Sequence, residues 1–233
     1  MKLEDSINSQ SLLLWENKFK DDEDVLPPLL YSSLKRETVL FVGLNPSFNK
    51  KSYISLLRNA QFSEFNLSDL YRWRNWKKED LKIVLQIEQF EKDNYRYFKK
   101  FEGVTTNTDL EWEHIDLFFF RETSQAQFKQ KLYEGNHLSN FFQSQLDLSK
   151  QLIVESSPRI IVVVNAFACS IFLKMFPDIN YDEKRGYHQT LLQNRSIPIF
   201  LASPLTGQRA MDNHSYKRLC WHIKQAIEDG KGG

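Results

Sequence analysis

The segment Val39–Phe48, with the sequence VLFVGLNPSF, most strongly constrains the fold of this chain. It begins with an apolar run rich in β-branched and aromatic side chains, which is typical of a strand buried on both faces. Gly43 then allows a tight turn or a close approach to a ligand, and Pro46 removes a hydrogen-bond donor and favours an extended Asn45. We therefore expect Asn45 at the carboxyl end of a buried strand, where open α/β sheets bind their ligands.

The rest of the chain continues an alternation of strands and helices. We expect further strands at 115–120, 159–164, 187–192 and 197–202. We expect helices at 11–19, 80–90, 94–101, 125–151, 166–176 and about 215–228. Apolar strands that alternate with helices indicate a mostly parallel sheet covered on both faces. The sequence thus predicts a single domain over 1–233, with an N-terminal helical extension over about 1–36.

Polar residues follow three of these predicted strands. Asn45 follows the first strand, Arg121 the second and Ser203 the last. Because the carboxyl ends of parallel strands meet at one edge of a sheet, we expect these residues to converge on one crevice.

Composition excludes several classes of protein and of site. The 31 basic and 30 acidic residues leave a net charge of +1, so nucleic-acid binding must depend on a local patch. Cys169 and Cys220 lie far apart, and the histidines show no ligand spacing, so we expect no metal and no cofactor. No apolar run is long enough to span a membrane, and the N-terminus is acidic and polar. We expect a cytoplasmic protein that does not bind membranes.

Two short segments mix cations with aromatic residues. Tyr71–Lys78 has the sequence YRWRNWKK, and Tyr95–Lys100 has the sequence YRYFKK. Such clusters suit a nucleic-acid surface, where cations contact phosphates and aromatic rings stack on bases. The alternative is a helix or turn that buries its aromatic residues and exposes its charges.

Three motifs together resemble the uracil-DNA glycosylase superfamily. The turn Gly43-Leu44-Asn45-Pro46-Ser47 resembles the first motif of that superfamily, in the Asn-bearing form of mismatch-specific and single-strand-selective glycosylases. The segment Leu201–Thr206 (LASPLT), with Arg209 shortly after it, is similar to the second motif, His-Pro-Ser-Pro-Leu-Ser followed by Arg. Asp116–Arg121 (DLFFFR) resembles the second core strand, with Asp116 in the place of an Asn.

The resemblance implies a three-layer α/β/α fold with a short, mostly parallel sheet. It also implies metal-independent hydrolysis of the N-glycosidic bond of uracil or another damaged base in DNA, with Asn45 orienting the attacking water. The residues implied to hold the base are Gly43, Pro46, Ser47, Phe48, Asp116, Phe118 and Ser203. Those implied to contact DNA are Pro204, Leu205, Thr206, Gly207 and Arg209, with Leu205 as the wedge that replaces an extruded base.

Two departures from the motifs leave other functions open. Leu201 stands where the family has a histidine that steadies the departing base, and Asn45 is a poor proton acceptor. A module of the same fold that binds nucleic acid or nucleotides without catalysis is one alternative. Another is an α/β enzyme that uses Asn45, Asp116 and Arg121 on a small phosphorylated substrate.

Structural roles are also open for four of these residues. Asn45 would then belong to an ordinary turn, and Leu205 would pack inward from a loop. Phe118 would be a core residue, because alternate side chains of such strands are usually buried. Asp116 would be a salt-bridged acid at the start of a strand.

Overall fold

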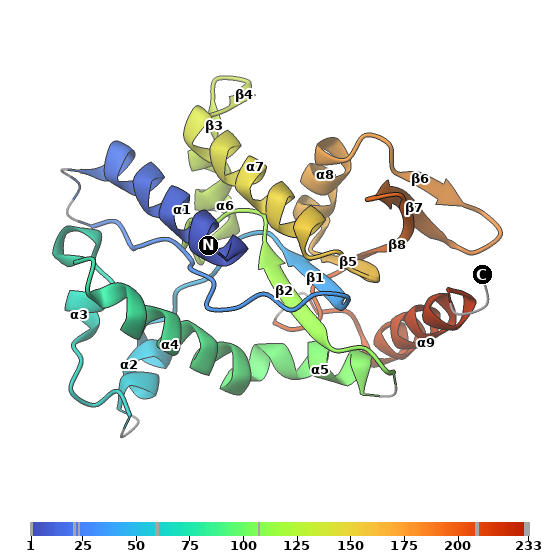
Figure 1. Ribbon diagram of the computed structural model, residues 1–233, viewed down its shortest axis with the longest axis horizontal. Helices are drawn as coiled ribbons and strands as arrows, with labels where there is room; N and C mark the ends of the chain where they lie inside the picture. Colours follow the sequence, from blue (N-terminus) through green and yellow to red (C-terminus); the bar gives the residue numbers. More distant parts are fainter. Residues whose placement is uncertain are drawn as a thin grey trace. The chain divides into compact units, whose positions relative to one another are not determined.

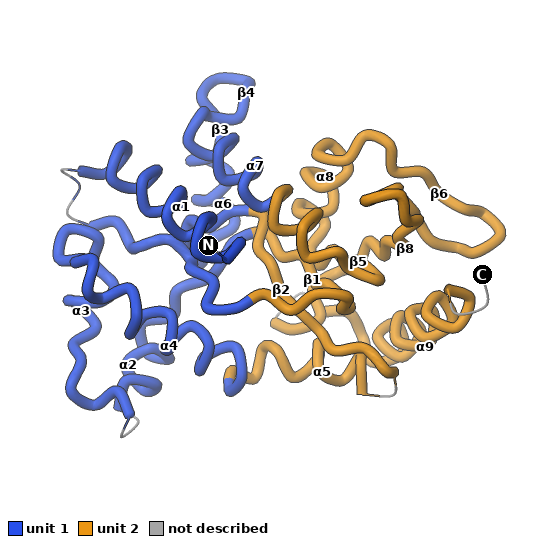
Figure 2. Tube along the Cα trace, viewed as in Figure 1, with its two compact units in different colours: residues 1–33, 45–94, 118–149 blue, residues 34–44, 95–117, 150–233 orange. Residues whose placement is uncertain are grey.

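The structure, a computed structural model, describes residues 2–20, 22, 24–58, 61–106, 108–207 and 210–230. The chain forms two compact units, each assembled from three separate segments (Figure 2). Unit 1 comprises 1–33, 45–94 and 118–149, and unit 2 comprises 34–44, 95–117 and 150–233. Because both units are built from discontinuous segments, the single domain over 1–233 stays a prediction.

Unit 2 contains the central sheet (Figure 1), which has six strands within the described residues. The strands are β1 (Val39–Gly43), β2 (Trp112–Asp116), β5 (Ile160–Val164), β6 (Asn180–Asp182), β7 (Tyr187–Leu192) and β8 (Arg195–Ala202). Their order is β2-β1-β5-β8-β7-β6. The first four in this order are parallel neighbours, whereas β7 pairs antiparallel with both β8 and β6. The predicted α/β class with a mostly parallel sheet is therefore confirmed.

Helices cover both faces of this sheet. They are the short 3₁₀ helix η2 (Arg96–Phe98), α5 (Lys99–Thr105), α8 (Ala166–Met175) and α9 (Asn213–Asp229). In Figure 1, α5 and α9 lie below the sheet and α8 lies above it. Phe41 of β1 stacks on Phe101 of α5 with 4.3 Å between the ring centroids, and Ile223 of α9 belongs to the same core. Val39–Val42 are buried throughout because both faces of β1 are covered.

Unit 1 is mainly helical. Its elements are α1 (Leu3–Phe19), α2 (Lys50–Leu57), α3 (Leu67–Leu70), the 3₁₀ helix η1 (Trp73–Asn75), α4 (Asp80–Asn94), α6 (Gln125–Leu132) and the hairpin β3 (Tyr133–Glu134) and β4 (His137–Leu138). α7 (Asn140–Glu155) begins in unit 1 and continues into unit 2 after Ser149. One core joins Tyr53 of α2 to Val84 and Ile87 of α4. Trp15 of α1 is fully buried and donates to the carbonyl of Leu26.

Most of the predicted elements are present, but the second strand differs. The prediction of a strand over 115–120 is wrong, because β2 covers 112–116 and the aromatic residues after it leave the sheet. The backbone N–H groups of Phe119 and Phe120 donate to the buried side chain of Gln145 on α7 rather than to a neighbouring strand. We expected Arg121 at a strand end, but it does not lie at one. The short edge strand β6 and the hairpin β3–β4 were not expected from the sequence.

Candidate functional site

The carboxyl ends of four parallel strands lie at one edge of the sheet in unit 2. Gly43, the last residue of β1, pairs with Asp116, the last residue of β2. Val42 pairs with Val163 of β5, which in turn pairs with Leu201 of β8. Ser203 directly follows β8 and thus lies at the same edge as Gly43 and Asp116. This edge is where parallel α/β sheets place their ligands.

Asp116 lies directly against Gly43. A Cβ atom at Gly43 would stand 2.1 Å from Oδ1 of Asp116 and 2.9 Å from Nε2 of His114. His114 and Asp116 are two residues apart on β2, so both side chains point to the same face of the sheet. Their Nε2 and Oδ1 atoms are 3.6 Å apart. The absence of a side chain at Gly43 thus provides the space that a carboxylate and an imidazole occupy together.

Aromatic rings surround the imidazole of His114. The rings of Phe98, Phe101 and Tyr97 lie 5.4, 5.5 and 6.3 Å from it, measured between centroids. Burial raises the pKa of Tyr97, and the negative charge of Asp116 acts in the same direction. Tyr97 therefore stays a neutral phenol at physiological pH. His114 and Tyr97 were not expected in the site from the sequence, although the i, i+2 spacing of His114 and Asp116 on a strand was a usable signal.

The loop after β8 carries most of the predicted DNA contacts. Ser203 and Gly207 are exposed, Pro204 and Thr206 are half-buried, and Gly207 has a φ of +89°. The carbonyl of Pro204 accepts from the backbone N–H of Met211, which closes the loop. Arg209 lies outside the described residues.

Leu205 does not have the position that a wedge requires. Its side chain is 3% exposed and belongs to the core under the sheet, together with Phe200 and Ile223. The wedge role inferred from the resemblance is therefore wrong for this conformation, because the side chain fills a core position instead of facing solvent. The alternative, that Leu205 packs inward, describes the structure.

Asn45 lies in unit 1, and its side chain holds the turn after β1. Nδ2 of Asn45 donates to the carbonyl oxygens of Glu122 and Phe120, at 2.8 and 3.3 Å, and also lies 3.2 Å from that of Pro46. The carbonyl of Pro46 accepts from the backbone N–H of Glu122 at 3.0 Å. These bonds connect two segments far apart in sequence, so the Asn45 amide has a structural role whatever else it does.

The other predicted residues of unit 1 are divided between surface and core. Ser47 is exposed, and Phe48 is half-buried with its ring 4.6 Å from that of Tyr53. Phe118 is fully buried, and its ring centroid lies 5.3 Å from that of Phe128. Phe118 is therefore a core residue of unit 1, and its ring is not exposed for a base to stack on.

Arg121 forms a buried polar network in unit 1 instead of binding at a strand end. The guanidinium pairs with Glu88 of α4 at 2.5 Å, donates to the Tyr53 hydroxyl at 3.0 Å and donates to the carbonyl of Pro27. Tyr71 also donates to Glu88, and Tyr53 donates to Glu91. Burial raises the pKa of Glu91 to about 7, and the negative charge of Glu88 adds to this shift. Each Arg121 nitrogen has a partner within the protein, and the buried guanidinium pairs with Glu88 instead of facing a substrate phosphate.

The segment Tyr71–Lys78 belongs to unit 1, and most of its aromatic side chains are buried. Tyr71 and Trp73 are buried, and Trp76 stacks on Trp73 with 6.2 Å between centroids. Arg72, Lys77 and Lys78 are exposed. The alternative interpretation, buried aromatic residues with solvated charges, therefore describes this segment.

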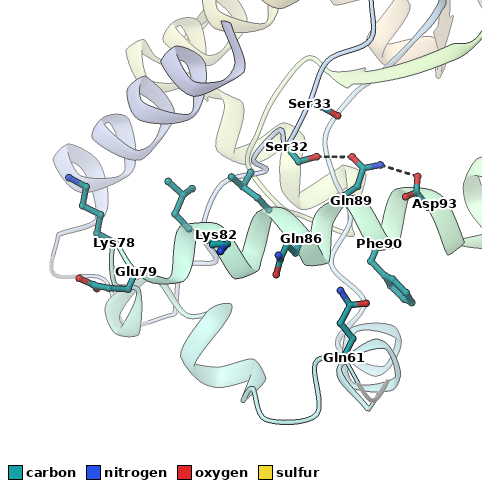
Figure 3. A pocket seen from close by; sticks show the side chains of 12 residues that line it. Ser32, Ser33, Gln61, Lys78, Glu79, Lys82, Gln86, Gln89, Phe90 and Asp93 are labelled. Carbon is teal, nitrogen blue, oxygen red and sulfur yellow. Dashed lines mark hydrogen bonds between the residues drawn. The ribbon is translucent and has the colours of Figure 1, made fainter. Parts of the chain in front are cut away.

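An open groove of about 800 Å³ follows α4 in unit 1 (Figure 3). Along one wall Ser32 donates to Gln89, and Gln89 donates to Asp93. Lys78 and Lys82 lie toward the other end of α4, close to Glu79 (Figure 3). The groove thus carries charges of both signs in similar number and shows no preference for an ionic ligand.

Two further features are absent from the residues that the structure describes. Among them, no cluster of three or more His, Cys, Asp or Glu side chains has the geometry of a metal site. No helix in those same ranges is long and apolar enough to cross a membrane.

Comparisons with known proteins leave the family open. No protein-family model matches the chain, and no curated protein sequence matches it.

Proposed function

We propose that this chain is a DNA glycosylase-like protein with a fold related to the uracil-DNA glycosylase superfamily. It would hydrolyse the N-glycosidic bond of uracil or another damaged base. The observation that carries the proposal is the Asp116 carboxylate, which lies against Gly43 and beside His114 at the carboxyl edge of the sheet. The first-motif turn and the loop after β8, which carry the resemblance, begin at this same edge.

The chemistry of the reaction matches these side chains. Departure of a base from C1′ leaves positive charge on the sugar, and a nearby carboxylate stabilises that charge and accepts a proton from the attacking water. We assign this role to Asp116, whose side chain is 7% exposed. His114 lies 3.6 Å from it, and its imidazole is a second side chain that can transfer a proton.

The remaining predicted residues have supporting roles in the proposal. Ser203 and Gly207 are exposed, so a hydroxyl and a backbone N–H are available to DNA phosphates. Orientation of the water by Asn45 stays a prediction, and its three carbonyl contacts support a positioning role for this residue.

An excision assay tests the proposal. Single- and double-stranded oligonucleotides with uracil, hypoxanthine or another damaged base are incubated with the protein, and alkali then cleaves any abasic sites. We expect strand breaks with at least one lesion, and a loss of about 100-fold or more in Asp116→Asn and His114→Gln, the usual range for a missing proton-transfer group.

Asp178→Asn provides the matched control, because Asp178 is exposed in unit 2 outside the site. This variant should retain the rate of the unaltered protein. If no lesion produces breaks above the Asp116→Asn background, the catalytic proposal is wrong.

One observation favours a second candidate, a nucleic-acid-binding module of the same fold that lacks excision activity. Leu201 provides no group to steady a departing base anion. Gel shifts with the same oligonucleotides distinguish the two, since the module would bind DNA and leave it intact. The phosphorylated-substrate alternative has less support, because the Arg121 guanidinium is buried and paired with Glu88.

A further inference from the structure

The aromatic residues of Tyr95–Lys100 are arranged differently from those of Tyr71–Lys78. Tyr95 is 38% exposed, whereas Tyr71 and Trp73 are at most 8% exposed. The Tyr95 ring stacks on that of Tyr97, with 6.4 Å between centroids and an interplanar angle of 21°. Of the two basic aromatic segments, the one in unit 2 therefore offers a tyrosine ring to solvent.

This stack continues to the candidate site. Tyr97 is half-buried, and its ring meets that of His114 edge-on at 6.3 Å. The charge of Asp116 contributes to the raised pKa of Tyr97, which places the phenol within the electrostatic field of the carboxylate. The Tyr97 ring thus lies between the imidazole of His114 and the Tyr95 ring, on which a planar group would stack.

Cations lie on two helical segments that pack against each other, residues 95–105 and α9. α5 packs against α9, where the Tyr216 hydroxyl donates to the carbonyl of Lys100 at 2.8 Å, and Nζ of Lys100 lies 4.3 Å from the centre of the Tyr216 ring. The basic residues on these two segments are Arg96, Lys99, Lys100, Lys217, Arg218 and Lys224, and the acidic residues on them or at the N-cap of α9 are Glu102, Asp212, Glu228 and Asp229. Lys99 pairs with Glu102 at 3.1 Å, and Lys224 pairs with Glu228 at 3.8 Å. The local balance is positive although the whole chain is almost neutral.

We infer that the surface formed by Tyr95, Arg96, Lys99, Lys217 and Arg218 binds single-stranded nucleic acid. A base stacks on the Tyr95 ring, and the cations contact phosphates on either side. Stacking on an exposed ring requires an unpaired base, and a positive rim complements the phosphate backbone, which together favour a single strand over a duplex. The inference rests on the proposed function in taking DNA as the substrate, and it adds the strand form and the surface.

Fluorescence anisotropy with labelled oligothymidylate tests the inference on the full chain. Loss of one stacked base weakens binding by about tenfold or more, so Tyr95→Ala should raise the Kd for single-stranded DNA by that factor, while Tyr95→Phe retains the unaltered Kd. Arg96→Gln and Lys99→Gln should each weaken binding and lower the slope of log K against log salt by about 0.7. Tyr181→Ala is the matched control, because Tyr181 is also exposed in unit 2, at 56%.

Three further arms distinguish other occupants. A single-stranded RNA oligonucleotide shows whether the surface distinguishes the two sugars, and a DNA duplex should bind more weakly than the single strand. Heparin binding should fall in Lys99→Gln and remain unchanged in Tyr95→Ala. Thermal unfolding of each variant confirms that the fold is retained.

The inference is overturned if Tyr95→Ala binds oligothymidylate as tightly as the unaltered protein, or if Tyr181→Ala weakens it equally. It is also overturned if the duplex binds more tightly than the single strand. These readouts are separate from the excision assay: binding through Tyr95 without base release would support this inference and contradict the proposed function. Base release that is unaffected by Tyr95→Ala would support the proposed function and contradict this inference.

Discussion

The Asp116 carboxylate occupies the space where a Gly43 side chain would be, because a Cβ on Gly43 would stand 2.1 Å from Oδ1 of Asp116. Neighbouring parallel strands bring the two residues into register. This contact explains why the last residue of β1 is a glycine, although its backbone has no positive φ that would require one. It also makes the position sensitive to the smallest substitution.

Gly43→Ala should therefore impair the site more than the fold. The added methyl group must displace both Asp116 and His114, at a cost of about 1–3 kcal/mol in unfolding free energy, which is typical of an overpacked position. Displacement of a catalytic group by 1 Å lowers the reaction rate by about 100-fold. Paired urea unfolding and excision assays measure both effects. Gly230→Ala is the control, since a Cβ there makes only ordinary contacts of 3.5 Å or more.

Asn45→Ala should lower stability because the carbonyls of Phe120 and Glu122 lose their shared donor. We expect a loss of about 1 kcal/mol in unfolding free energy, because these acceptors are only partly buried. Urea unfolding provides the measurement. A variant that unfolds like the unaltered protein but has lost excision activity would show that the role of Asn45 is catalytic only.

Leu205→Ala should behave as a core substitution. Removal of a fully packed leucine side chain costs about 2–5 kcal/mol, and the core that contains Phe200 would bear this loss. Leu191→Ala, at a side chain that is 66% exposed, should change stability little. Unchanged unfolding of Leu205→Ala together with weaker DNA binding would restore the wedge interpretation.

Arg121 and Glu88 should be strongly coupled. Arg121→Met leaves the Glu88 carboxylate buried without its cation, for an expected loss of about 3–5 kcal/mol. The double variant Arg121→Met with Glu88→Gln should recover part of that loss, because no buried charge remains. A double-mutant cycle in urea measures the coupling free energy, and strict additivity of the two substitutions would contradict the pairing.

Glu91 should make unit 1 less stable as pH rises. Burial, together with the charge of Glu88, raises its pKa from 4.5 in the unfolded chain to about 7 in the folded protein. The folded state therefore holds the proton more tightly, and its unfolding free energy falls between about pH 4.5 and 7 and then levels off. The expected change is about 3 kcal/mol, since each pKa unit corresponds to about 1.4 kcal/mol.

Glu91→Gln removes this titration. The difference in unfolding free energy between the unaltered protein and Glu91→Gln, measured from pH 4 to 8, should follow this curve. A flat difference across that range would show that Glu91 titrates normally.

The position of β2 shows where sequence patterns fall short. An aromatic run such as Leu117–Phe120 has the composition of a buried strand, and the sequence alone assigns it to the sheet. In the structure, Leu117 still donates to the carbonyl of Gly43, but Gln145 on α7 accepts from the backbone N–H groups of Phe119 and Phe120. Residues 118–120 belong to unit 1. A distant side chain thus replaced the strand ladder as hydrogen-bond partner, and periodicity carries no information about such a partner.

The sequence by itself determined the α/β class, the strands predicted at 39–43 and 159–164, and the placement of Gly43 and Ser203 at one edge, because these depend on local apolar runs and on the geometry of parallel strands. Asp116 was expected at the start of a strand, and the structure places it at the end of β2 instead. Only the tertiary structure paired Arg121 with Glu88, buried Leu205 and placed His114 beside Asp116. Those outcomes depend on which distant side chain is close enough to satisfy a charge or fill a space, and packing in three dimensions decides that.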